Sequence, residues 1–222
     1  MLDRPGPGAG RPATSTVLRG GAREQVLTAA RVCFLEYGVR KTTMEKVAAT
    51  AGLSRSIVYR LFLDRRELIE AAAALRMAEI ADGIAENVPR DIDWDAKTLV
   101  ETFTEVSLAV IEGVRSDPEL GVLLADDSPV SLPQVVWMSD VAQRGAQFWR
   151  PWLEHLRTLG ILRKDVPLDY LIEWLQTVYP SIILRQHMAI EDERRVIERF
   201  ILASLAMVSD PAEARWLAPW HE

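Results

Sequence analysis

Small and apolar residues occur at fixed offsets around Gly52 in the segment TTMEKVAATAGLSRSIVYRLF, residues 42–62. The other members of this set are Val47, Ala48, Ala51, Leu53, Val58 and Leu61. The spacing predicts two short helices that pack at a steep angle, with the small Ala48 at their closest approach and a positive φ angle at Gly52. This arrangement is a helix-turn-helix, a unit that places one helix in the major groove of DNA.

Charge is distributed unevenly along the chain, although its net value of −6 would by itself argue against nucleic acid as a partner. Up to Arg66 there are 12 Lys and Arg and 5 Asp and Glu, a net charge of +7. The remaining residues carry 14 Lys and Arg and 27 Asp and Glu, a net charge of −13. This division indicates that the basic first part meets phosphate, whereas the acidic remainder is repelled by it.

The composition is that of an ordinary globular protein, with 49% hydrophobic and 26% charged residues over 222 positions. This length is enough for one or two domains with a substantial core. No apolar run approaches the ~18 residues of a membrane-spanning helix, and the first residues are rich in Gly, Pro and Arg where a secretory signal would be apolar. Cys33 is the single cysteine, which excludes an intramolecular disulfide. We expect a cytoplasmic protein without a membrane partner.

Three segments are predicted: a disordered arm at residues 1–21, a three-helix head at 22–67 and a helical body at 68–222. The Gly- and Pro-rich arm carries Arg4, Arg11 and Arg19, which either enter a minor groove or stay solvated. Apolar residues recur at helical intervals from residue 26 to residue 37, and Gly38 is expected to cap that helix. The patterns Thr42-x-x-Glu45 and Asp64-x-x-Glu67 fit capping boxes that open the second and fourth helices.

The predicted fold class is all-α, with about nine helices. The fourth helix is expected to reach about residue 86, and the later helices are expected at about residues 94–115, 118–125, 133–159, 167–188 and 191–208. No run alternates apolar and polar residues over the length of a strand, so no sheet is expected. Pro151 and Pro180 fall inside two of these helices and should kink or interrupt them.

The segment GVRKTTMEKVAATAGLSRSIVYRLFLDRRELI, from Gly38 to Ile69, resembles the DNA-binding signature of the tetracycline-repressor (TetR) family of bacterial transcription regulators. Beyond it, the chain is similar to that family in size and helical architecture. The resemblance implies a homodimer that represses transcription by occupying a palindromic operator in double-stranded DNA. It also implies that a small molecule entering the C-terminal body weakens DNA binding. The family often has histidine where this chain has Leu61, which removes one polar contact.

The second helix of the motif is expected to begin at Ser54 and to turn one face outward. That face carries Arg55, Ser56, Tyr59 and Arg60 and lies opposite the apolar side of the helix. Either arginine is suited to bidentate hydrogen bonds with guanine, or to a phosphate. Tyr59 resembles the family's phosphate-binding tyrosine, and the alternative is a half-buried tyrosine that only packs.

Two helix ends are predicted to meet phosphate. Arg65 and Arg66 lie in the first turn of the fourth helix, where the helix dipole disfavours a cation by roughly 0.3–1 kcal/mol unless an anion arrives. Many family members have lysine at the position of Arg65. Thr42 and Thr43 offer a second helix end, although Thr42 is also interpreted as a cap. The preceding loop residues complete the predicted DNA-binding set with Arg40 and Lys41.

The body is rich in aromatic residues, with seven tryptophans in the whole chain. One helical stripe is formed by Trp137, Val141, Phe148, Trp152, Leu156 and Leu159. Such a stripe is typical of core, but aromatic walls with a few polar groups also describe a small-molecule cavity, and the family places its cavity here. We therefore expect a small apolar or aromatic effector, with Arg144, Gln147 or His155 as polar contacts. The apolar lining is predicted to be Phe103, Leu123, Trp137, Val141, Phe148, Trp152, Trp174 and Tyr179.

The last two long helices are expected to pair with their copies in a four-helix dimer interface. Two apolar stripes are candidates, and either is equally interpretable as core within one chain. The first stripe is Leu171, Leu175, Val178 and Ile182. The second stripe is Val196, Phe200, Ala203 and Met207.

Two other classes of function compete with a DNA-binding regulator. An enzyme is disfavoured because Cys33 lies on an apolar helical face, the three histidines His155, His187 and His221 form no His-Glu-x-x-His pair, and no Gly-rich phosphate loop with a lysine is present. Paired acids such as Asp126 and Asp127 are interpreted as a solvated loop. We expect no catalysis, cofactor or metal. The second rival is a helical lipid-binding or protein-interaction module with a vestigial helix-turn-helix.

Overall fold

A computed structural model of the chain describes residues 13–88, 94–185 and 188–206. Over these residues the chain forms eleven α-helices and one π-helix but no strand, so the predicted all-α class is confirmed. The chain divides into two compact units, Met1–Ala72 and Ala73–Glu222, and this division falls five residues after the predicted boundary of the head. In the described part of the chain, no helix is long and apolar enough to cross a membrane.

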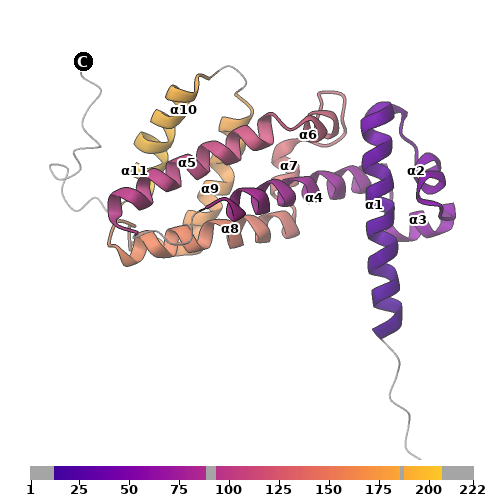
Figure 1. The fold of residues 1–222 in the computed structure, drawn as a ribbon, viewed down its shortest axis with the longest axis horizontal. Helices are drawn as coiled ribbons and strands as arrows, with labels where there is room; N and C mark the ends of the chain where they lie inside the picture. Colours follow the sequence, from indigo (N-terminus) through magenta and orange to yellow (C-terminus); the bar gives the residue numbers. More distant parts are fainter. Residues whose placement is uncertain (1–12, 89–93, 186–187, 207–222) are drawn as a thin grey trace, which may run out of the picture. The chain divides into compact units, whose positions relative to one another are not determined.

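The first unit is built on one long helix. Its elements are α1 (Ala13–Lys41), α2 (Met44–Ala51), α3 (Arg55–Leu61) and the first turns of α4 (Arg65–Glu86). The helices α2 and α3 pack on each other and on α1 (Figure 1). Their shared core is apolar and fully buried, because each short helix turns its apolar face toward α1. The most buried side chains of this core include Val26, Ala30, Phe34, Val47, Val58 and Phe62.

Two glycines shape the first unit as predicted. Gly52 ends α2 with φ 65°, and the amides of Gly52 and Leu53 donate to the carbonyls of Ala49 and Ala48 at 3.1 and 3.0 Å. Gly38 has φ 76° and breaks the helical path of α1 three residues before its end. Both positions lie in the left-handed region that side chains with a Cβ atom rarely adopt.

Two predictions for the first unit are wrong. Residues 13–21 are helical instead of belonging to an arm, because the glycine pair at 20–21 lies inside a helix that continues into strong helix-forming sequence; Arg4 and Arg11 lie outside the described residues. The cap of α2 is Thr43, whose hydroxyl accepts from the Lys46 amide, and not Thr42. Thr42 is fully buried and donates its hydroxyl to carbonyls at the end of α1.

The start of α4 agrees with its predicted capping box. The Asp64 carboxylate accepts from the Glu67 amide at 2.9 Å. The Glu67 carboxylate in turn accepts from the amide of Leu63, one residue before the predicted partner. This reciprocal pair satisfies two amides that the helix itself leaves unpaired.

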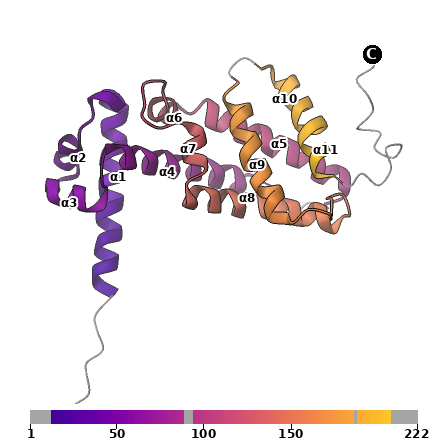
Figure 2. The ribbon, with the colours of Figure 1, turned by 180° about the vertical axis from the view of Figure 1, so that it is seen from behind.

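The second unit contains the rest of α4 and all later helices. They are α5 (Ala96–Arg115), α6 (Pro118–Leu123), α7 (Leu132–Val136), α8 (Ser139–Thr158), α9 (Leu168–Ile183), α10 (Ile190–Val196), the π-helix η1 (Ile197–Ile201) and α11 (Leu202–Leu205). The helix α9 packs against α5, α7 and α8, and α5 also packs against α10 and η1 (Figure 2). An isolated antiparallel bridge joins Leu162 to Ala206.

Two predicted helices are divided, which explains why the structure has more than nine. The expected helix 133–159 is two helices, because Met138 is extended with ψ 139° and a new helix starts at Ser139 with Asp140 in its first turn. The expected helix 191–208 contains the π-helical turn η1, which inserts wider turns into an α-helical run. Pro151 and Pro180, in contrast, do not interrupt α8 and α9.

Arginine side chains tie the ends of helices together in the second unit. Arg76 on α4 donates to Asp117 at 2.9 and 2.7 Å, and the other oxygen of Asp117 caps α6 through the Leu120 amide. Arg115 donates to two carbonyls at the end of α9 and pairs with the buried Glu193 of α10 at 2.6 Å. These contacts satisfy helix ends that would otherwise leave polar groups unpaired.

We expect Gly52→Ala to lower the stability of the first unit by roughly 1–2 kcal/mol, because an L-residue would be held in the left-handed region. Gly21→Ala is the matched control: Gly21 lies in α1 without a positive φ and a Cβ atom there meets nothing within 4 Å. It should stabilise by roughly 0.5–1 kcal/mol. Urea unfolding followed by circular dichroism measures both changes. Equal effects of the two substitutions would contradict a role for the turn conformation.

Candidate nucleic-acid interface and body cavity

The helix α3 turns one face outward, as the sequence predicts. Ser54 caps it by accepting from the Ile57 amide at 3.4 Å, and Val58 is fully buried beneath it. Ile57 and Leu61 are half-buried at the sides of the same apolar face. The residues left on the exposed face are Arg55, Ser56, Tyr59 and Arg60. They form a surface, called here the reading face, with two guanidinium groups and two hydroxyls.

Each side chain of the reading face has a different local constraint. Arg55 lies 3.8 Å from Glu45 of α2, and the Ser56 hydroxyl is 2.9 Å from that of Ser54. Tyr59 is 48% exposed, so about half of the residue is covered by its neighbours. Within the described residues, no hydrogen bond or ion pair engages the exposed side chain of Arg60. Arg60 is therefore the reading-face cation that has no such contact within the described part of the chain.

Glu45 is ionised beside Arg55. Its own backbone amide and the Thr43 hydroxyl donate to the carboxylate and lower its pKa, and the charge of Arg55 lowers the pKa further. The carboxylate therefore holds Arg55 near the start of α2. Because the Arg55 side chain is 70% exposed and that of Glu45 is 39% exposed, water screens the pair and the guanidinium stays available to a stronger anion.

In the loop before α2, some of the residues predicted to bind DNA are exposed and another is buried. Arg40, Lys41 and Thr43 are exposed. Thr42, in contrast, is fully buried with its hydroxyl 2.9 Å from the carbonyl oxygens of Cys33 and Gly38. Its side chain cannot reach a phosphate, and the prediction that it binds DNA is corrected on this ground. Lys46, which was not predicted, holds the loop by donating to the Lys41 carbonyl at 3.0 Å.

The first turn of α4 gives its two arginines structural partners. Arg65 donates to the carbonyls of Val39 and Arg40 at 3.2 and 3.1 Å, and Arg66 pairs with Glu70 at 2.9 Å. The carboxylates of Asp64 and Glu67 already lie at this helix end, where they compensate the dipole. The position of these arginines therefore does not require a phosphate, contrary to the reasoning from sequence. Contact of either one with DNA stays a prediction.

A cavity of about 110 Å³ lies within the second unit. Its walls come from α4, α5, α7, α8 and α9, and they are mainly aliphatic and aromatic. Four predicted residues line it, namely Val141, Arg144, Phe148 and Tyr179. The lining residues that sequence reasoning missed are Ala74, Met77, Ala78, Ile80, Ala81, Val110, Val114, Val136, Gly145, Trp149, Gln176, Pro180 and Ile183. The Ala-rich stretch of α4 was the one feature of the sequence that indicated these lining residues, because small side chains leave space beside a helix.

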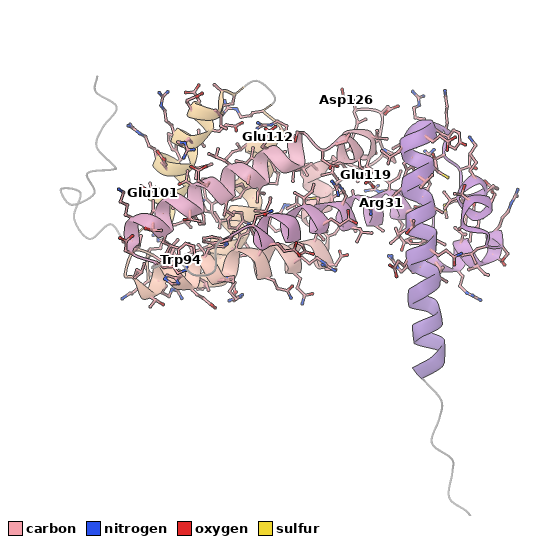
Figure 3. The ribbon with its side chains drawn as sticks, viewed as in Figure 1. Arg31, Trp94, Glu101, Glu112, Glu119 and Asp126 are labelled. Carbon is pink, nitrogen blue, oxygen red and sulfur yellow. The ribbon has the colours of Figure 1, made fainter. Side chains whose placement is uncertain are left out.

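The other predicted lining residues lie elsewhere. Phe103 and Leu123 are fully buried in the core, and Trp137 is 51% exposed. Trp152 and His155 contact Trp94 with ring centroids 5.9 and 6.0 Å apart, and Figure 3 labels that tryptophan near the end of the second unit. The remaining two are exposed: Gln147 on α8, and Trp174, whose indole donates to Ser204 at 2.9 Å. The predicted stripe on α8 is therefore rotated from the true buried face of Trp149, Leu153 and Leu156.

Trp149 is the centre of the aromatic wall. Its ring stacks on Tyr179 with centroids 4.8 Å apart, meets Phe148 edge-on at 4.9 Å and lies 5.4 Å from Phe103. The Tyr179 hydroxyl donates to Ser107 at 2.6 Å, and Ser107 donates to the Phe103 carbonyl at 2.6 Å. Burial raises the pKa of Tyr179, an effect that the bond with Ser107 partly offsets. The hydroxyl of Tyr179 thus has its hydrogen-bond partner within the core, and its ring is the part of the side chain that lines the cavity.

The predicted dimer stripes are mostly internal. Leu171, Leu175 and Ile182 are buried within the chain itself, so their assignment to an interface is corrected. Val178, Val196 and Ala203 are half-buried, while Phe200 is 56% exposed; Met207 lies outside the described residues. The apolar residues that α9 does expose are Tyr170, Trp174 and, just after its end, Leu184. The bond from Trp174 to Ser204 shows that α9 and α11 lie side by side.

Acidic side chains cover the outside of the second unit. Glu101 and Glu112 project from α5, and Asp126 from the loop after α6 (Figure 3). Among the residues that the structure describes, no cluster of three or more histidine, cysteine or carboxylate groups is suited to a metal ion. The basic head and acidic body seen in the sequence thus correspond to the two compact units.

Comparison with known proteins agrees with this geometry. The model for bacterial regulatory proteins of the tetR family matches residues 26–72. The HTH-type transcriptional repressor AcnR of Corynebacterium diphtheriae is 27% identical over 190 residues, covering 78% of this chain and 85% of AcnR. The HTH-type transcriptional repressor Rv1474c of Mycobacterium tuberculosis is 27% identical over 177 residues, covering 73% of this chain and 81% of that protein.

Solved structures share the fold at lower identity. RolR in complex with resorcinol has a TM-score of 0.60 at 18% identity, covering 93% of this chain and 98% of RolR. The TetR-family repressor QsdR of R. erythropolis has a TM-score of 0.61 at 18% identity, covering 85% and 97%.

An exposed reading face on the second helix of a helix-turn-helix, joined to an all-α body, defines a DNA-binding regulator. The match over residues 26–72 and the repressors aligned along most of the chain make this chain similar to the transcriptional regulators of the tetR family.

We expect Arg65→Ala to lower the stability of the first unit by about 1 kcal/mol, because two carbonyls near the end of α1 lose a charged donor. The matched control is Arg66→Ala, whose exposed pair with Glu70 contributes at most about 0.5 kcal/mol. Thermal unfolding monitored by circular dichroism compares the two variants. A purely DNA-contacting role for Arg65 requires both variants to unfold at the wild-type temperature.

Proposed function

We propose that this regulator is a homodimeric repressor that binds a palindromic operator and is released by a small apolar or aromatic effector. The single observation that carries the DNA-binding part is the reading face. Arg55, Tyr59 and Arg60 point outward from α3 because Val58 occupies the buried side of a very short helix. Guanidinium groups in that position are suited to guanine edges, and the exposed tyrosine is suited to a phosphate.

The homodimer is supported by an apolar face that stays partly exposed in the single chain. Tyr170, Trp174 and Leu184 occur at positions i, i+4 and i+14 of one helical face, and Phe200 is exposed on η1. Exposed apolar residues that recur along neighbouring helices favour burial against a second copy. Two recognition helices related by a two-fold axis would then read half-sites about 34–36 Å apart.

Release by an effector is supported by the cavity and by α4. This helix lines the cavity from Ala74 to Ala81, and its first turns bury Leu68 and Ile69 in the core of the head unit. A ligand that binds more tightly when α4 is in one placement than in another would shift the population of DNA-binding conformations. The structural relative RolR was solved with resorcinol, a one-ring aromatic molecule.

We expect Arg60→Ala to reduce discrimination between operator bases, by roughly 1–3 kcal/mol at one position of each half-site. Lys41→Ala should instead weaken binding to all sequences about equally and reduce the salt slope by about 1, because an exposed lysine contacts phosphate without reading bases. Fluorescence anisotropy with the palindrome upstream of the gene and its single-base variants measures both. Absence of any salt-dependent binding by the wild-type protein would refute the repressor.

We expect Phe200→Asp to convert the dimer to a monomer and to weaken operator binding, because a carboxylate would be buried against the second copy. Leu159→Asp is the control, since Leu159 is a partly exposed leucine at the end of α8, outside the proposed face. Light scattering after size-exclusion chromatography gives the molar mass of each variant. A dimeric Phe200→Asp protein, or a monomeric control, would place the interface elsewhere.

A further inference from the structure

We infer that the body cavity takes a one-ring aromatic carboxylate, with the ring against the wall formed by Phe148, Trp149 and Tyr179 and the carboxylate on Arg144. The inference rests on the proposed function, since it specifies the chemical class of the effector. It goes beyond an apolar or aromatic ligand by assigning a negative charge and an upper size. The volume of the cavity, the chemistry of its walls and the charge of Arg144 each support one part of this inference.

The volume limits the ligand to a single ring. The cavity holds about 110 Å³, and an apolar cavity of roughly 150 Å³ is known to hold benzene. The space therefore matches one six-membered ring, whereas a fused two-ring system requires the walls to move apart. Phe148, Trp149 and Tyr179 offer ring faces and edges to such a ligand, and pairs of this kind favour centroid distances of about 4.5–7 Å.

The amide and hydroxyl groups of the wall side chains already have partners within the protein, whereas in the described part of the chain the guanidinium of Arg144 does not. The Gln176 amide donates to the Ala142 carbonyl at 2.6 Å, and the Tyr179 hydroxyl donates to Ser107. Gln176 is held against Gly145, where a Cβ atom would lie 2.7 Å from the amide nitrogen. Within the described residues, the guanidinium of Arg144 has no hydrogen bond or ion pair, so its donors face no competition from the protein.

Arg144 differs in this respect from most arginines of the second unit. Six others pair with carboxylates inside the unit: Arg76, Arg115, Arg150, Arg163, Arg194 and Arg195. In a unit with an excess of acidic residues, an arginine without a carboxylate at the edge of an apolar cavity is available for an external anion. Because Arg144 is exposed, the ligand carboxylate stays at the mouth and avoids the cost of full burial.

The charged groups of the cavity wall also determine the sign of the charge that the ligand carries. Among the described residues that line the cavity, Arg144 is the one charged side chain, and no carboxylate accompanies it. A cationic ligand would meet a like charge, whereas a carboxylate accepts two parallel hydrogen bonds from a guanidinium. Arg144 and Phe148 are four residues apart on α8, so they lie on one helical face and can hold the two ends of one small molecule.

The experiment uses the full-length protein and three probes of one size, namely benzoate, benzyl alcohol and benzylammonium, together with the larger 1-naphthoate. Isothermal titration calorimetry should show benzoate binding about tenfold or more tightly than benzyl alcohol, because a charge-assisted pair is added. Benzylammonium and 1-naphthoate should bind more weakly than benzoate. Comparable affinities for benzoate and benzyl alcohol would overturn the inference.

Variants then test the residue itself. Arg144→Gln should lose about tenfold in benzoate affinity with benzyl alcohol unchanged, and Arg144→Lys should recover part of the loss because the charge is kept. Arg185→Gln is the matched control, because this substitution removes the same charge from an exposed arginine that lies outside the cavity. An equal loss in the Arg185→Gln protein would show a general field effect and overturn the assignment to Arg144.

Operator binding separates this inference from the proposed function. Benzoate that binds through Arg144 and leaves operator affinity unchanged supports the carboxylate site and contradicts the effector role. Release of operator by benzyl alcohol, with no preference for benzoate, supports the repressor and overturns the carboxylate site. Anisotropy of labelled operator, measured with each probe, distinguishes these outcomes.

Discussion

The packing of α3 against its neighbours is the constraint on which the DNA-binding head depends. A seven-residue helix is far below the ~12–15 residues at which isolated helices become even marginally stable. It forms because Val58 and the following Phe62 are buried in the core, Ser54 caps its first turn and Gly52 sets its direction. Since these contacts occupy the buried side of the helix, the polar residues of α3 lie on its exposed side.

The positive charge of the head is divided between holding the unit together and meeting DNA. Arg65 ties α4 to the end of α1, and the guanidinium of Arg23 lies 4.5 Å from the ring centroid of Phe62. Lys46 holds the loop before α2 and covers the ring of Tyr37 at 4.4 Å. Counting basic residues therefore overstates the charge that is free for phosphate. The exposed residues of α3 and Lys41 of the loop belong to the smaller set that is available.

Helical periodicity predicted where helices lie far better than which way they face. On α8, Trp149 and Trp152 are three residues apart, and a stripe through Trp152 was as consistent with the pattern as one through Trp149. On α9, the apolar stripe Leu171, Leu175 and Ile182 fits either the core or a dimer interface. Both alternatives bury the same apolar area, so the pattern of one helix cannot distinguish them.

The sequence by itself determined the helix-turn-helix, the turn at Gly52, the outward face of α3 and the basic head on an acidic body, because these depend on offsets of a few residues. Only the tertiary structure decided that Thr42 is buried, that Arg65 caps a helix end and that Trp149, not Trp152, lines the cavity. Those outcomes depend on neighbours from distant segments, whose contacts set burial and hydrogen bonding. Local periodicity carries no information about those neighbours.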